Sequence, residues 1–215
     1  MTKLCGIQSG ILVGMGLPAG DRELVQIVDA ALAGAALRAG AWLVCRLGCT
    51  QCCYGAFVIS ELDALRLGAG METLRREKPA LAAEIERRAQ MWIGTHGADF
   101  PGDLGTGRLG DSDADRERFA EFANEAACPA LDPATGRCDV YEWRPMTCRV
   151  FGPPIQMDGG KDGGKSLGHC ELCFVGATED EVVGCEMPVP DELEKELLAG
   201  IREKCETLVA FALLR

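Results

Sequence analysis

Cysteine is the residue type whose number and spacing point to chemistry in this sequence. The chain has 215 residues and 12 cysteines, and four of these lie within residues 45–53. Short spacings let a tight loop direct two thiolates at one metal, and thiolates select zinc, copper(I) or iron–sulfur centres. The pattern therefore predicts metal binding. The candidate ligands are Cys45, Cys49, Cys52, Cys53, Cys128, Cys138, Cys148, Cys170 and Cys173.

Disulfides and simple burial are the alternative uses of these thiols. We recognise no export signal, and a chain of this length buries a core without covalent staples, so disulfides are disfavoured. A free cysteine can also pack as a small hydrophobe. We expect this for Cys205, on the apolar face of a predicted last helix. Cys5 is expected to be incidental, and the role of Cys185 is left open.

The identity of the metal does not follow from spacing alone. Four cysteines complete either a zinc site or an iron–sulfur cluster, so the set suits two centres, or one centre with spare thiols. Neighbouring side chains diverge, so only one of Cys52 and Cys53 is expected on a given metal atom, and which one is open. His96 and His169 are expected in surface and turn roles. The spacing matches neither a zinc ribbon nor a ferredoxin.

Charge and hydropathy narrow the classes of partner. The formal net charge is -11, which disfavours binding to nucleic acid or to an anionic membrane surface. No apolar run reaches the roughly 18 residues of a membrane span. We therefore expect a cytoplasmic protein without nucleic-acid or membrane partners.

The hydrophobic periodicity predicts a mainly α fold. We expect one helical domain over residues 21–215, with irregular cysteine-rich metal-binding loops and a small hairpin, after a Gly-rich leader over residues 1–20. The expected helices cover residues 21–39, 60–67, 71–93 with a break at Pro79, 112–127, a short turn at 145–148, and 191–214. Residues 140–143 are expected to be extended, and residues 158–165 to form a hairpin tip.

The longer cysteine motif resembles a known family. It comprises Cys45-x3-Cys49-x2-Cys52-Cys53, then Cys128-Pro-x-Leu-Asp, and then Gly136-Arg-Cys138-x-Val-Tyr-Glu-x-Arg-Pro-x-x-Cys148-Arg. This arrangement is similar to the bacterial cysteine-cluster proteins called YkgJ-like, or the CxxCxxCC zinc- or iron-chelating domain, over a motif core of residues 45–173. One branch of that family, the flagellin lysine-N-methylases, links it to iron–sulfur chemistry and S-adenosylmethionine.

The resemblance implies a role for Arg144 and favours iron over zinc. Arg144 matches the Arg-Pro of the family and is expected to bind the cofactor by donating to thiolates or carbonyls; an ion pair with Glu142 or another acid is the alternative. The favoured hypothesis is that the protein binds an iron–sulfur cluster, [4Fe-4S], and has an electron-transfer, redox-sensing or accessory role. Its expected partner is a redox or client protein. The alternatives are a lysine-N-methylase-like enzyme using S-adenosylmethionine, and a structural zinc module or metal chaperone.

Overall fold

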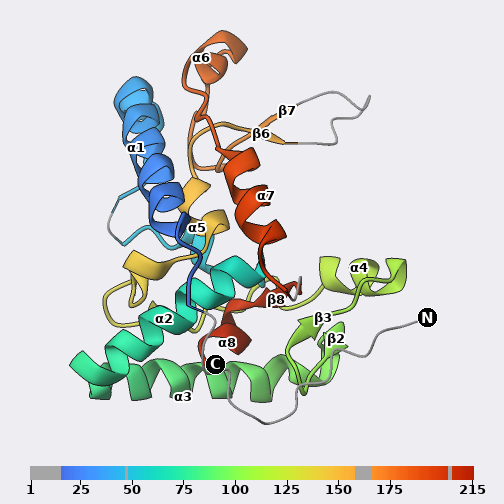
Figure 1. Cartoon of the computed structure of the whole chain (residues 1–215). Helices are drawn as coiled ribbons and strands as arrows, with labels where there is room; N and C mark the ends of the chain where they lie inside the picture. Colours follow the sequence, from blue (N-terminus) through green and yellow to red (C-terminus); the bar gives the residue numbers. More distant parts are fainter. Residues whose placement is uncertain (1–15, 47, 158–165, 203–204) are drawn as a thin grey trace.

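Helices dominate the computed structural model, which describes residues 16–46, 48–157, 166–202 and 205–215 (Figure 1). The described strands form only short antiparallel pairs: β1 with β8, β2 with β3, β4 with β5, and β6 with β7. The mainly α expectation is therefore confirmed. The helices are α1 (Asp21–Ala39), α2 (Glu61–Glu77), α3 (Pro79–His96), α4 (Asp113–Ala120), α5 (Met146–Val150), α6 (Glu179–Gly184), α7 (Asp191–Ala199) and α8 (Val209–Ala212).

Short elements connect these helices. The 3-10 turns are η1 (Gly40–Trp42), η2 (Gln51–Cys53), η3 (Gly97–Asp99) and η4 (Tyr141–Trp143). The strands are β1 (Val58–Ile59), β2 (Gly102–Asp103), β3 (Arg108–Leu109), β4 (Leu131–Asp132), β5 (Arg137–Cys138), β6 (Ile155–Met157), β7 (Ser166–Gly168) and β8 (Thr207–Leu208). Of the candidate ligands, Cys52 and Cys53 lie in η2, Cys138 in β5 and Cys148 in α5, and the other five lie in irregular segments between elements, as the sequence predicts.

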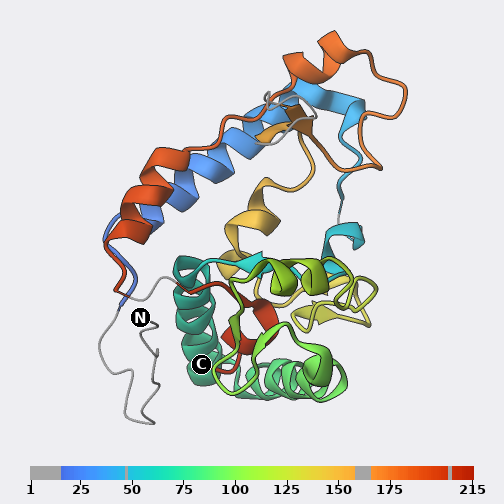
Figure 2. The same cartoon turned by 90° about the vertical axis from the view of Figure 1, so that its right-hand side faces the viewer.

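Helices α2, α3 and α8 form the main body, which occupies the lower half of the molecule in Figures 1 and 2. Leu67 and Met71 of α2 pack with Ile85 of α3 and Leu213, which follows α8, in the largest buried cluster. Helix α2 ends before α3 begins at Pro79, because proline suits the first turn of a helix but not its interior. The predicted break at Pro79 is confirmed.

Helices α1 and α7 lie side by side above the body (Figure 2). Leu24 and Val28 of α1 are buried in a second cluster against Leu197 and Leu198 of α7. By length and composition alone, Asp21–Trp42 is apolar enough to span a membrane, with a mean hydropathy of 1.4. The expectation from apolar runs did not include this segment. Part of the apolar surface of α1 packs against α5 and α7, whereas Ile27 and Leu37 are 41 % and 86 % exposed.

Several predicted element boundaries are wrong. Helix α2 continues to Glu77 rather than ending near residue 67, and α4 ends at Ala120 rather than near residue 127. Residues 141–143 form a 3-10 turn instead of an extended segment. The chain bends after α4, where Ala123 has a positive φ of 51°. The hydrophobic periodicity of a sequence does not indicate where the backbone turns and ends a helix.

The predicted last helix is divided, which is the largest error. Helix α7 ends at Ala199, and the chain then enters the body as β8 and α8. The buried hydroxyl of Thr207 donates to the carbonyl of Gly107 at 2.6 Å, and Leu208 pairs with Val58. Because these contacts are distant in sequence, they override the helical pattern. Cys205 is therefore not on a helical face. The hairpin β6–β7 is confirmed, whereas its tip and Cys5 lie outside the described residues.

A buried ion network joins the upper and lower parts of the molecule. Arg66 of α2 is 2 % exposed and contacts Asp21 at 2.5 Å and Asp63 at 2.5 Å. Asp63 also accepts the backbone N–H of Met146 at 2.9 Å, at the start of α5. Because α5 carries Cys148, this network places one of the predicted metal ligands. Asp21 is the first residue of α1, so the network also joins that helix to α2.

Candidate metal centre

The nine candidate cysteines fall into two groups, and the described cysteines form no disulfide. The inner group is Cys52, Cys53, Cys128, Cys138 and Cys148. The outer group is Cys45, Cys49, Cys170 and Cys173. In the inner group, the Cys148 thiol interacts electrostatically with those of Cys128, Cys138 and Cys52. In the outer group, the Cys45 thiol interacts with those of Cys173, Cys49 and Cys170.

Backbone hydrogen bonds join the first two segments of the inner group. The N–H of Cys128 donates to the carbonyl of Cys53 at 2.7 Å. The N–H of Gly55 donates to the carbonyl of Ala126 at 2.9 Å, in the same short ladder. Residues that are about 75 positions apart in sequence are thus fixed side by side.

The third and fourth segments complete the inner group. In the hairpin β4–β5, Cys138 pairs with Leu131, and the N–H of Leu131 donates to the carbonyl of Cys128 at 2.9 Å. Helix α5 supplies Cys148. Cys128 and Cys138 pack against the largest hydrophobic cluster, so the main body supports these thiols directly.

Burial and neighbouring thiols shift the pKa values of the inner group. Burial raises the pKa of Cys128 to about 12 and also raises the pKa of Cys148. The hydrogen bond from Cys53 lowers the pKa of Cys52 to about 6, with a further contribution from the charge of Arg144. The same bond raises the pKa of Cys53. The Cys52–Cys53 pair therefore shares one proton near neutral pH.

One buried arginine, Arg144, lies beside the inner group. The Arg144 guanidinium is 3.9 Å from the centre of the Tyr141 ring and donates to the Tyr141 carbonyl at 3.0 Å. Its charge acts on both Cys52 and Cys138. It is also 3.4 Å from a carboxylate oxygen of Asp29, so the acid that it meets is Asp29 rather than Glu142. The predicted carbonyl contact and the predicted ion pair thus occur together.

Arg149 is a residue that the sequence analysis missed. It is 1 % exposed and contacts Asp29 at 2.8 Å. It also donates to the carbonyls of Arg144 and Glu142. The only sequence signal for it was its place next to Cys148 at the end of the family motif.

The outer group is assembled from loops above the body. The sulfur atoms of Cys45 and Cys173 are 4.0 Å apart. The N–H of Cys170 donates to the carbonyl of Gly152 at 3.1 Å, and the N–H of Cys173 donates to the carbonyl of Cys170 at 2.9 Å. Burial raises the pKa of Cys45 to about 12, and the neighbouring Cys173 thiol adds to this shift. Metal binding must therefore displace protons from these thiols.

The other described cysteines, Cys185 and Cys205, and the two histidines lie outside the two groups. Cys185 is buried in the hydrophobic cluster that contains Cys170 and Cys173. Cys205 is partly buried and lies in no described helix. His169 has its Nδ1 3.0 Å from the carbonyl oxygen of Cys170, and His96 packs on the ring of Trp92 at 4.8 Å.

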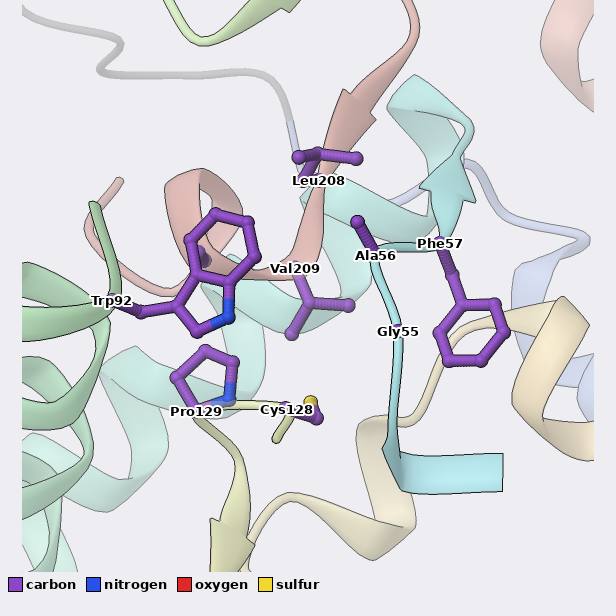
Figure 3. Close-up of a pocket in the computed structure, with 9 residues that line it drawn as sticks. Gly55, Ala56, Phe57, Trp92, Cys128, Pro129, Leu208 and Val209 are labelled. Carbon is purple, nitrogen blue, oxygen red and sulfur yellow. The ribbon is translucent and has the colours of Figure 1, made fainter. Parts of the chain in front are cut away.

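A small pocket lies beside Cys128 (Figure 3). Trp92, Pro129 and Val209 face the segment of residues 55–57 across it. Its volume is about 20 Å³, which is room for roughly one water molecule. Sites for cofactor-sized molecules have volumes of about 300–1,000 Å³. This pocket therefore does not fit S-adenosylmethionine.

The donor set fits a soft or borderline metal. The free thiols of the inner group come from four separate chain segments. Zinc ions and iron–sulfur clusters both take four thiolates. Within the described residues, no three His, Cys, Asp or Glu side chains form a closed coordination sphere. The sulfur atoms must therefore move closer together when a metal binds.

The comparison with protein families agrees with this chemistry. The model of the CxxCxxCC family, described as "Putative zinc- or iron-chelating domain", matches residues 44–171. Because the match covers more than half of the chain, the protein belongs to this family, and the resemblance in the sequence is confirmed. The protein is thus a cysteine-ligated metal-binding protein of the zinc- or iron-chelating class. No curated protein and no solved structure gives a significant match.

Proposed function

We propose that the inner group holds an iron–sulfur cluster, [4Fe-4S], and that the protein transfers electrons, senses redox state or assists another protein in the cytoplasm. The observation that carries this proposal is the meeting of five thiols with the buried Arg144, whose charge acts on Cys52 and Cys138. Four thiolates suffice for the cluster. The fifth thiol, from Cys52 or Cys53, then hydrogen-bonds to its neighbour.

Charge compensation supports a cluster at the inner group. A centre held by four thiolates is anionic, and burying an anion without a partner is costly. Arg144 is 7 % exposed, and its positive charge acts on Cys52 and Cys138. Hydrogen bonds and charges around a cluster set its reduction potential. When bound, the cluster supplies one-electron chemistry, and these residues hold it and tune its potential.

A partner surface lies next to the inner group. Tyr54 follows Cys53 and is 49 % exposed, and Tyr141 lies under Arg144 and is 54 % exposed. Exposed aromatic side chains are typical of protein contact surfaces. We infer that a redox or client protein docks here. The S-adenosylmethionine-dependent alternative stays a prediction, and no contact described above favours it.

The metal content of anaerobically purified protein tests this proposal. We expect an absorption band near 400 nm, about four iron atoms and an equal amount of acid-labile sulfide per chain. Cys138→Ser should lose the iron and the sulfide. The matched control Cys205→Ser should keep both, because Cys205 belongs to neither group. Zinc in the inner group, without sulfide, would contradict the proposal.

A further inference from the structure

The outer lobe is a part of the molecule with a small hydrophobic core. It comprises residues 40–46 and 169–187, which lie together away from the α2–α3–α8 body (Figure 2). The N–H of Phe174 donates to the carbonyl of Trp42 at 3.0 Å and joins the two segments. Three of the five buried residues in its cluster are cysteines, whereas the body cluster has thirteen buried residues. Units with so small a core rely on disulfides or metals for stability.

The rest of the outer lobe adds little buried apolar surface to this small cluster. Helix α6 has no buried residue. Leu172, Val175 and Val183 are 45 %, 72 % and 50 % exposed. The described cysteines form no disulfide that would take the place of this packing. A bound metal is therefore the remaining kind of cross-link that the residues of the lobe offer.

The geometry of the outer group suits a single ion rather than a cluster. With Zn–S bonds of about 2.3 Å and tetrahedral angles, two sulfur ligands are about 3.8 Å apart. The Cys45 and Cys173 sulfur atoms already stand at 4.0 Å. In a cubane cluster each cysteine sulfur binds a different iron, so the sulfur atoms are farther apart. The N–H of Cys173 donates to the carbonyl of Cys170, and the N–H of Cys49 donates to the carbonyl of Arg46, both at 2.9 Å, so tight turns hold Cys170 and Cys49 near this pair.

Two further contacts hold the outer ligands in place. The side chain of Gln51 donates to Glu171 at 2.7 Å, which joins the loop of Cys49 to that of Cys170. Gly152 has a φ of +126°, and a Cβ at this position would lie 3.1 Å from the Cys45 sulfur. Because glycine has no Cβ, the Cys45 sulfur has room at this place.

We propose that Cys45, Cys49, Cys170 and Cys173 bind one zinc ion, and that this ion holds the outer lobe together. The inference rests on the metal binding of the family but not on a cluster in the inner group. Zinc has no redox chemistry, and structural zinc sites with four thiolates contribute folding energy directly. The two groups would then have separate tasks, one structural and one redox.

Zinc content and zinc X-ray absorption of the full chain test the ligand set. We expect one zinc per chain, with four sulfur neighbours at about 2.3 Å. Cys173→Ser should lose this zinc, whereas Cys185→Ser should keep it, because Cys185 is buried in the same cluster but lies outside the group of four. Iron at this site, nitrogen or oxygen ligands, or zinc retained in Cys173→Ser would overturn the proposal. If zinc is bound as expected but iron and sulfide are absent, only the proposed function fails.

Hydrogen exchange on the unmutated protein tests the structural role without relying on folding of a variant. After the zinc is removed with a chelator, amides in residues 169–187 should exchange faster by about tenfold or more, while those of α2 and α3 stay protected. Adding zinc back should restore protection. Unchanged exchange in residues 169–187 would overturn the structural role.

Discussion

The inner and outer cysteine groups use the same ligand chemistry on different supports. The inner thiols rest on the main body through backbone hydrogen bonds between residues 53–55 and 126–128 and through packing of Cys128 and Cys138. The outer thiols are held by loops whose few buried residues are mostly cysteines. The difference teaches that the main body, which folds by apolar burial, can support a metal site, whereas the proposed zinc would have to supply the support that the small outer lobe lacks.

The largest expected effect concerns the support of the inner group. Arg66→Met leaves the buried carboxylates of Asp21 and Asp63 without their cation, and breaking a buried pair costs about 3–5 kcal/mol of unfolding free energy. Denaturant unfolding measures this loss. Because Asp63 also holds the start of α5, iron binding through Cys148 should weaken as well.

A matched control for Arg66 is Arg116 on the surface of α4. Its contact with Asp113 is exposed, and such pairs contribute little. Arg116→Met should therefore leave both stability and metal content unchanged. Equal losses in the two variants would show that the buried network has no special role in positioning α5.

A smaller effect is expected from crowding the outer group. Gly152→Ala introduces backbone strain of about 1–3 kcal/mol and places a methyl group against the Cys45 sulfur. The zinc affinity should fall by about tenfold or more, since 1.4 kcal/mol is a factor of ten. Competition with a chromophoric chelator measures it. Gly176→Ala, with a φ of +82° but open space, separates strain from crowding and should retain more affinity.

The two groups should also differ in thiol reactivity. In metal-free protein near pH 7, Cys52 is largely a thiolate because its pKa is lowered to about 6, and thiolates react with iodoacetamide. Mass spectrometry should find Cys52 alkylated before Cys45, whose pKa is raised to about 12. Arg144→Gln should slow the reaction of Cys52, whereas the remote Arg116→Gln should not. Faster alkylation of Cys45 would contradict the pKa assignment.

The smallest expected effect is the dependence of stability on alkaline pH in the metal-free protein. Folding raises the pKa of Cys128 to about 12, above the value of about 8.5 in an unfolded chain. The full stability is therefore present below about pH 8.5, where the Cys128 thiol is neutral in both states. As the pH rises from there toward 12, the thiol ionises in the unfolded chain but not in the folded one, and the stability falls. The thermal midpoint should fall by a few degrees from about pH 8 to about pH 10. In Cys128→Ala the fall should be smaller.

The sequence predicts the local features of this molecule better than its long-range ones. The break at Pro79, the helix starts near residues 60 and 112, and the hairpin β6–β7 follow from residues near in sequence. The division of the last segment into α7, β8 and α8 depends on Thr207 and Leu208 meeting residues far away in the chain. The hydrophobic periodicity of residues 191–214 carries no information about those distant contacts.

The same distinction applies to the site. Cysteine spacing predicts metal ligation, and the family motif singles out Arg144. The division into two groups depends on the fold, because Cys49 and Cys52 are three residues apart yet belong to different groups. The turn η2 carries Cys52 toward the body, while the Cys45 loop lies against Cys173. Buried Arg149 likewise becomes visible only through its contact with Asp29 of α1.

The separateness of the two groups is the central claim, and metal analysis of two variants in parallel tests it most directly. Iron, sulfide and zinc are measured in anaerobically purified Cys138→Ser and Cys173→Ser beside the unmutated protein. We predict that Cys138→Ser loses iron and sulfide and keeps zinc, and that Cys173→Ser loses zinc and keeps iron and sulfide. Loss of the same metal in both variants would show that the nine thiols serve one shared centre and would contradict the account.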